Sequence, residues 1–114
     1  GGVASVLNEI AKAAGVGADI VEAAFPVAEE VRGACEILGL DPLYVANEGK
    51  LLAFVARERA DEALALLRTS RYGAEAAIVG EVTAEHPGRV VLRSRVGGRR
   101  VVDLLTGDQL PRIC

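Results

Sequence analysis

The chain contains few aromatic residues and no excess of basic ones. Its 114 residues include two phenylalanines, two tyrosines and no tryptophan, and its formal net charge is -3. Aromatic side chains are the platforms on which unpaired bases stack, and clustered Lys and Arg neutralise phosphates. The composition therefore excludes a general nucleic-acid binder, and we expect no nucleic-acid partner.

Cysteine and histidine are also scarce. The two cysteines, Cys35 and Cys114, are too few for a disulfide framework. The single histidine, His86, is distant from both in sequence, so no metal-ligand spacing exists and no Ser-His-Asp triad can be argued. His86 stands in a His-Pro-Gly sequence, which predicts a turn. We therefore expect no metal site formed by this chain.

Long apolar runs and an export signal are missing as well. The longest apolar runs, such as LLAFVA at 51–56, are too short to span a bilayer, and no basic segment leads into an apolar stretch. We expect a cytoplasmic protein with reduced cysteines and no membrane contact. The hydrophobic fraction is 51% and the mean hydropathy is +0.30, which is apolar for a small domain. Together with a start at Gly1, this indicates a piece of a longer protein with a face for a partner.

The spacing of apolar residues predicts helices that alternate with strands. We expect helices over 1–15, 26–39 and 58–69, with Gly or Pro at their ends. We expect strands over 18–22, 76–84, 89–95 and 99–105, and two more within 43–55. This order indicates one α/β domain over 1–109, followed by a flexible tail over 110–114.

Two of these elements carry more detailed expectations. The face of the first helix that should pack on the sheet is formed by Val3, Leu7, Ile10 and Ala14. Within 43–55, two apolar runs flank Asn47-Glu48-Gly49, which is typical of a tight turn between strands. Both runs are apolar nearly throughout, so we expect central strands that are covered on both faces.

The two cysteines differ in setting. Cys35 lies on the apolar face of the second predicted helix, where a cysteine is usually buried and inert. Cys114 ends the chain after Pro111, which fixes its own φ and biases the preceding residue toward extended backbone. A thiol at the tip of such a tail can travel between sites. The adjacent α-carboxylate raises the thiol pKa and Arg112 partly offsets this; the alternative is an incidental terminal residue.

Glu48 and the first two glycines are further candidates. Two strands would lift Glu48 to the surface as a general base whose charge state Lys50 tunes; the alternative is a solvated turn carboxylate. Gly1 and Gly2 open the first helix, where exposed N–H groups can bind phosphate. The alternative for these glycines is close packing.

The last predicted hairpin carries a basic face. Arg93, Arg95 and Arg99 alternate on it, and the opposite face consists of Val90, Leu92, Val102 and Leu104. A solvated sheet face or a charged edge strand is the ordinary explanation of such a pattern.

Four segments resemble a known family. They are LGLDPLYVANEGKLLAFV, AAIVGEV, HPGRVVL and VVDLLTGDQLPRIC, which ends in Pro111, Arg112, Ile113 and Cys114. The chain resembles the C-terminal domain of the HypE family of hydrogenase expression/formation proteins, within the aminoimidazole ribonucleotide (AIR) synthetase-related superfamily. The resemblance implies a three-layer α/β/α sandwich with a mixed sheet.

The resemblance also implies a reaction. A carbamoyl group that the partner HypF places on Cys114 would be dehydrated with ATP to a thiocyanate. The cyano group would then pass to iron held by a HypC–HypD complex, as the cyanide ligand of a [NiFe]-hydrogenase. Glu48 matches the glutamate to which the family assigns proton removal, with Asn47 and Lys50 beside it.

The resemblance places ATP and Mg²⁺ mainly on an N-terminal domain beyond this chain, through which full-length members form homodimers. The fragment alone is therefore expected to be inactive. Two other functions stay open: a non-catalytic docking or oligomerisation module, and a related enzyme that makes selenophosphate or a purine intermediate. The terminal thiol favours the dehydratase over these related enzymes, which need no such group.

Overall fold

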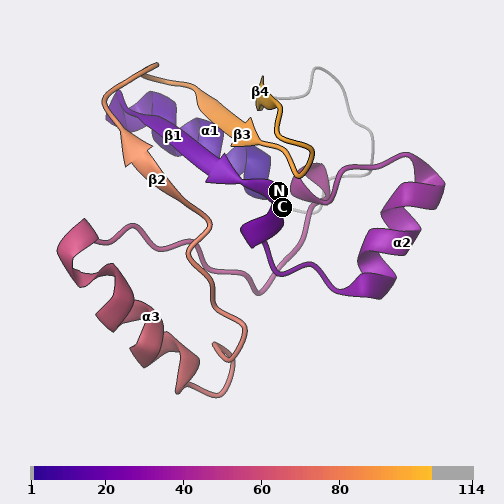
Figure 1. The fold of residues 1–114 in the computed structure, drawn as a ribbon, viewed down its shortest axis with the longest axis horizontal. Coiled ribbons are helices and arrows are strands. Elements are labelled where there is room, and N and C mark those ends of the chain that lie inside the picture. Colours follow the sequence, from indigo (N-terminus) through magenta and orange to yellow (C-terminus); the bar gives the residue numbers. More distant parts are fainter. Residues whose placement is uncertain (1, 104–114) are drawn as a thin grey trace.

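The described part of the chain, residues 2–103, contains three α-helices and four strands, and the two strands expected within 43–55 are not among them. The structure, a computed structural model, describes residues 2–103 (Figure 1). Its elements are α1 (Val3–Ala14), β1 (Gly17–Val21), α2 (Glu29–Leu38), α3 (Ala60–Arg68), β2 (Gly80–Thr83), β3 (Val90–Arg93) and β4 (Arg99–Val101). Gly1, Leu104 and the predicted tail over 110–114 lie outside the described residues.

The strands form one mixed sheet in the order β2-β1-β3-β4. β1 and β3 are parallel, with Ala18 opposite Val90, whereas β2 pairs with β1 and β4 pairs with β3 in antiparallel fashion. A parallel pair requires a crossover connection, and the chain from α2 to β2 provides it. The predicted α/β class with a mixed sheet is confirmed.

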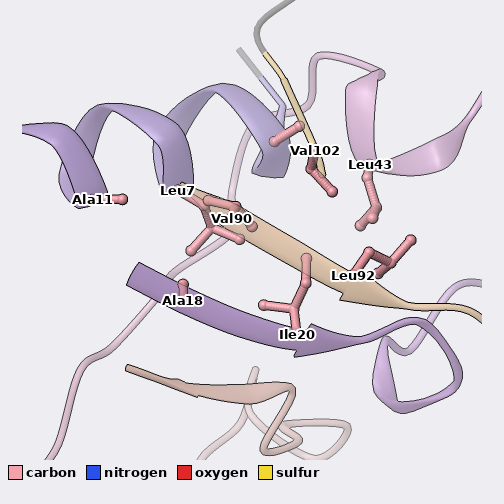
Figure 2. Packing of buried hydrophobic residues seen from close by; sticks show 9 residues of the cluster. Leu7, Ala11, Ala18, Ile20, Leu43, Val90, Leu92 and Val102 are labelled. Carbon is pink, nitrogen blue, oxygen red and sulfur yellow. The ribbon is translucent and has the colours of Figure 1, made fainter. Parts of the chain in front are cut away.

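α1 covers one face of this sheet and lies behind it in Figure 1. Figure 2 shows the side chains that fill this layer, namely Leu7, Ala11, Ala18, Ile20, Leu43, Val90, Leu92 and Val102. Val90, Leu92 and Val102 are fully buried, and burial of each such side chain is worth roughly 1.5–3 kcal/mol. The predicted apolar face of the last hairpin is thus confirmed for these three residues.

The buried face of α1 differs from the predicted one. Leu7 is buried and Val3 packs against the core as expected, but the other buried residues of α1 are Ala4, Asn8 and Ala11, and Ala14 is exposed. Small side chains let a helix approach a sheet closely, so alanines rather than Ile10 form this contact. Asn8 is accommodated because its amide is hydrogen-bonded.

α2 and α3 contribute little to the core. Cys35 is the one buried residue of α2, which confirms its predicted burial, and α3 has none. In Figure 1 these helices project to opposite sides, away from α1. No helix within residues 2–103 has the length and apolarity needed to cross a membrane.

The two strands predicted within 43–55 do not form. Asp41 accepts a hydrogen bond from the Leu43 backbone N–H at 3.0 Å and begins a short 3-10 helix at Pro42–Tyr44. From 45 to 56 the chain has no strand assignment, and Leu51 is 79% exposed. A strand needs a partner for its backbone groups, and no described strand pairs with this segment. The expectation of central strands covered on both faces was wrong.

Candidate functional site

Part of the predicted site lies outside the described residues, namely Gly1, Pro111, Arg112, Ile113 and Cys114. The structure does describe the turn that carries Glu48 and the chain up to Asp103, eleven residues before Cys114. The geometry of the candidate site therefore consists of these two segments and what joins them.

Glu48 lies on an exposed turn. The chain bends at Glu48 and Gly49, and Gly49 has a φ of 73°, a left-handed conformation that favours glycine. Asn47 donates a hydrogen bond from its side-chain nitrogen to the Val45 carbonyl at 3.2 Å, which holds the entry to the turn. Glu48 and Lys50 are both exposed, and neither takes part in an ion pair within residues 2–103. The Glu48 carboxylate is thus open to an incoming group.

The segment before this turn is fastened to the chain end that leads toward Cys114. Arg100 donates to the Asp41 carboxylate at 2.7 Å, and the Tyr44 hydroxyl donates to the Asp103 carbonyl at 2.9 Å. Between these two polar contacts, Leu43 and Val102 belong to the same buried cluster (Figure 2). We call these contacts between residues 41–44 and 100–103 the junction.

α1 and the residue before it also contact the junction. The Asn8 side chain is 3% exposed and donates to two carbonyl oxygens, that of Ala4 at 2.9 Å and that of Val102 at 2.8 Å. Gly2 is buried, and a Cβ there would lie 3.3 Å from the Leu43 carbonyl oxygen and 3.2 Å from that of Tyr44. Close packing therefore accounts for a glycine at position 2, and its phosphate role stays a prediction.

The pKa of the Tyr44 phenol lies above its ordinary value. Burial raises its pKa, Asp41 and Asp103 raise it further, and Arg100 opposes them. The phenol thus keeps its proton up to high pH and remains a hydrogen-bond donor to the Asp103 carbonyl.

The basic face predicted on the last hairpin is present for Arg93 and Arg99, whereas Arg95 lies in the turn between β3 and β4. Arg93 and Arg99 are cross-strand partners, and Arg99 lies 3.4 Å from the Asp19 carboxylate. Arg95 lies 3.9 Å from the Glu22 carboxylate, so it is part of an exposed ion pair. These contacts support the ordinary explanation of a solvated sheet face.

The predicted turn role of His86 is also borne out. His86 has a φ of 39° and its Nε2 lies 3.1 Å from the Asp19 carboxylate, which joins the β2–β3 turn to β1. No three His, Cys, Asp or Glu side chains within the described part of the chain converge in a way that could hold a metal ion. We assign no step to a metal ion in this part of the chain.

Sequence reasoning missed the residues that make the junction. Asp41, Tyr44 and Arg100 carry no local pattern that pairs them, because the junction joins residues 59 positions apart. The Asp41-Pro42 pair favours a turn, and this pattern argues against a strand that starts at Leu43.

The chain is similar to known proteins over its whole length. The family described as "AIR synthase related protein, C-terminal domain" matches residues 1–93. Carbamoyl dehydratase HypE of Rhodobacter capsulatus is 57% identical over 114 residues, which are 100% of this chain and 34% of that protein.

Solved structures agree with this similarity. The crystal structure of hydrogenase maturation protein HypE in complex with ATP is 47% identical with a TM-score of 0.89, and the match covers 100% of this chain and 35% of that chain. The crystal structure of a HypE–HypF complex is 45% identical with a TM-score of 0.84, covering 90% and 33%. The chain thus spans about a third of the length of the relatives it matches.

Proposed function

This chain belongs to the family of AIR synthase related proteins, and on that premise we propose that it is the C-terminal domain of an ATP-dependent carbamoyl dehydratase of the HypE type. The observation that carries the proposal is the 57% identity with a carbamoyl dehydratase HypE over all 114 residues. In this reading the full protein makes the cyano group that becomes the cyanide ligand of a [NiFe]-hydrogenase.

The proposed reaction converts an S-carboxamide on Cys114 to a thiocyanate. The carboxamide oxygen attacks the γ-phosphorus of ATP, the bond from that phosphorus to its bridging oxygen breaks, and ADP leaves. Phosphorylation turns a poor leaving group into a good one. The C–O bond then breaks, phosphate departs with the oxygen, and the nitrogen gives up its two protons as the C≡N bond forms. One carboxamide and one ATP thus give one thiocyanate, one ADP, one hydrogen phosphate that carries one of the two protons, and one released proton.

Glu48 is the residue that we assign to proton removal. Its carboxylate is exposed and takes no part in an ion pair within the described residues, so it can approach the amide nitrogen and accept a proton. Asn47 would keep the turn in shape, and Lys50 would influence the charge of the carboxylate. Pro111, Arg112 and Ile113 would present the Cys114 sulfur.

The partners of the full protein are part of the proposal. A similar protein has been solved in complex with HypF, and another with ATP, which supports HypF as the carbamoyl donor and ATP as the second substrate. We assign the cyano acceptor role to iron on a HypC–HypD complex, the Mg²⁺–ATP ligands mainly to an N-terminal domain, and homodimer formation to the full-length protein. Gly1 and Gly2 would lie near the phosphates.

Intact-mass measurement of the full-length protein tests the reaction. After incubation with HypF, carbamoyl phosphate and ATP, we expect a mass gain of one carbamoyl group and then the loss of one water, both on the peptide that contains Cys114. The Cys114→Ser protein is the matched control and should show neither change. A carbamoyl adduct that never loses water would remove the dehydratase assignment.

The isolated 114-residue chain should not turn over ATP. We assign the Mg²⁺–ATP ligands mainly to the N-terminal domain of the full protein, so the fragment would lack most of the nucleotide site. The full-length protein is the positive control for this measurement. ATP hydrolysis by the purified fragment above a blank would contradict the expectation.

A docking or oligomerisation module is the second candidate function. Leu51 is 79% exposed, Val55 53% and Phe54 48%, on a segment that pairs with none of the described strands, and exposed apolar groups of this kind often meet a partner. Deletion of Cys114 alone from the full-length protein distinguishes the two functions. Hydrogenase maturation that survives this deletion would favour docking, whereas its loss would favour the dehydratase.

A further inference from the structure

Residues 46–55 are a run of backbone without partners in the described structure. None of their backbone N–H or carbonyl groups is hydrogen-bonded to another backbone group within residues 2–103, and Figure 1 shows no strand between the short helix at 42–44 and α3. We propose that an extended segment of the full-length protein, formed by residues that precede Gly1, pairs as a β-strand with residues 50–55. This inference rests on the proposed function, because it takes the chain to be the C-terminal domain of a longer protein.

The residues of this run have the pattern of a strand. Leu51, Leu52, Phe54 and Val55 carry large apolar side chains, and phenylalanine and valine favour strands. In an extended chain alternate side chains point to opposite sides, so Leu52 and Phe54 would share one side, and Leu51 and Val55 the other. Leu52 packs against the buried cluster, whereas Leu51 is 79% exposed. The run thus has apolar side chains for both sides of a strand, and the described residues provide no backbone partner at its edges.

Contacts on both sides hold this run in place. Before it, Leu43 belongs to the buried cluster, and within it Leu52 packs on the same cluster. After it, Arg57 donates to the Glu81 carboxylate of β2 at 2.6 Å. Both side chains of that pair are exposed, so it adds little to stability, but it orients the chain. A segment that pairs here does not have to order the run first, which lowers the entropic cost of pairing.

The entry into α1 lies beside the start of this run. Gly2 is buried, and a Cβ there would lie 3.2 Å from the Tyr44 carbonyl oxygen and 3.3 Å from that of Leu43. α1 begins at Val3, so chain that precedes it enters the fold next to residues 43–44. About ten extended residues span up to about 35 Å, which is long enough to reach residues 50–55 from that point. The residues that precede Gly1 are therefore the occupant that the geometry favours.

A segment of the same chain also has an advantage over a second molecule. A short tether gives an effective concentration in the millimolar range, and an unpaired apolar edge that stays open invites aggregation. This chain covers 34% of the Rhodobacter capsulatus relative, so most of such a protein lies outside the chain and can supply the strand. Pairing within one molecule would cover the edge as the protein folds.

Hydrogen exchange of the full-length protein, followed by mass spectrometry, tests the pairing. A strand with one neighbour bonds alternate N–H groups to it, so alternate amides within 50–55 should exchange at least about 100-fold more slowly than in an unstructured peptide of the same sequence, since the pair must open first. Peptides from β1 and β3 are the internal control for a folded protein. The exposed residues Arg71 and Tyr72 should exchange quickly in the same sample.

Photo-cross-linking identifies the strand that pairs. Phe54 of the full-length protein is replaced by p-benzoylphenylalanine, which keeps an aromatic ring at a position that is 48% exposed in this chain. After irradiation, we expect cross-links to residues within about 20 positions before Gly1, enough for one strand and its connection. The same replacement at Tyr72, which is 88% exposed, is the matched control and should not cross-link to those residues.

The outcomes are distinct. Slow exchange at 50–55 with cross-links to the residues just before Gly1 supports the inference. Fast exchange at 50–55 in a protein whose β1 and β3 amides are slow overturns it. Cross-links to a more distant part of the protein, or to a second copy, also overturn it, since another occupant then covers the run. A protein that pairs as expected, yet never loses water from its carbamoyl adduct, refutes the proposed function and leaves the pairing intact.

Discussion

Asn8 offers a sharp test of how the junction is built. Its side chain is 3% exposed and lies between two carbonyl oxygens, those of Ala4 and Val102, at 2.9 Å and 2.8 Å. Both neighbours are acceptors, so the nitrogen of the amide must face them and donate both of its protons. The site therefore requires a neutral double donor, and few other side chains can supply one.

Two substitutions probe this requirement. Asn8→Ala removes both hydrogen bonds and leaves the Val102 carbonyl buried without that donor. At about 1 kcal/mol for the bond to Ala4 and about 1–3 kcal/mol for the Val102 carbonyl left as an unsatisfied buried acceptor, the loss should be about 2–4 kcal/mol. For a domain of this size that lowers the thermal midpoint by about 10–20 °C.

Asn8→Asp should behave differently with pH. An ionised carboxylate can only accept, and here it would face two carbonyl oxygens in a buried place, so burial and these dipoles raise its pKa above the ordinary value of about 4. A raised pKa means that the favourable contribution of the protonated form is fully present below the unfolded-state pKa. It is lost as the pH rises through the folded-state pKa. Asn8→Asp should thus be less stable than Asn8→Ala at pH 7 and at least as stable near pH 4.

The free energy of unfolding is measured by urea unfolding at pH 4 and at pH 7, followed by circular dichroism. Each variant is compared with the wild type at the same pH. Asn47→Asp, a matched change on an exposed turn, should show no such dependence. An Asn8→Asp protein whose stability relative to Asn8→Ala is the same at pH 4 and pH 7 would refute the double-donor requirement.

Two other predictions follow from the same structure. A Cβ at Gly17 would overlap the Glu85 carbonyl oxygen at 2.2 Å and the His86 ring at 2.5 Å, so Gly17→Ala should destabilise the domain by more than 1 kcal/mol, about the lower limit for a backbone clash. A Cβ at Gly33, inside α2, would have no atom within 4 Å beyond its chain neighbours and the backbone of its own helix, so Gly33→Ala should instead stabilise the domain by about 0.5–1 kcal/mol. Urea unfolding of both variants shows whether the free energy of unfolding falls in Gly17→Ala and rises in Gly33→Ala. Glu48→Gln in the full-length protein should keep carbamoyl loading and slow dehydration at least about 100-fold, the usual worth of a general base; water loss at the normal rate would remove Glu48 from the mechanism.

The parts of the fold that the sequence predicts well are those in which one residue pattern has one structural solution. The helical spacing around Leu7 with glycine after the last turn leads to α1, and the apolar run from Val90 to Leu92 between Arg89 and Arg93 leads to β3. The mixed sheet follows from this order of elements. The buried face of α1 was predicted less well, because hydrophobic size alone points to Ile10, whereas close approach to the sheet favours Ala4 and Ala11.

The segment from 43 to 55 shows where pattern reasoning fails. Its apolar runs are consistent with strands, yet an apolar run specifies only that side chains prefer burial, and it does not supply the backbone partner that a strand needs. The structure instead uses Asp41 and Pro42 to make a short helix, and the residues from 45 to 56 form no ladder with the described strands.

The sequence proposes the residues of the candidate site from their chemistry. It does not predict the contacts that surround them. Cys114 stands out in the sequence because a terminal thiol has few structural uses. Glu48 was selected by the family resemblance, since a carboxylate on a turn is otherwise an ordinary solvated group. Tyr44 and Arg100 do not stand out, because tyrosine and arginine are common at surfaces. Their role follows only from contacts with residues 59 positions away, which one sequence cannot reveal.

The position of Glu48 outside the buried cluster also determines how a loss of activity in a Glu48 variant can be interpreted. The buried cluster consists of residues from α1, β1, β3 and the two segments of the junction, whereas Glu48 lies outside it on an exposed turn. Substitutions at exposed positions usually change stability by less than about 0.5 kcal/mol. A loss of dehydration in Glu48→Gln with an unchanged unfolding midpoint would therefore report chemistry.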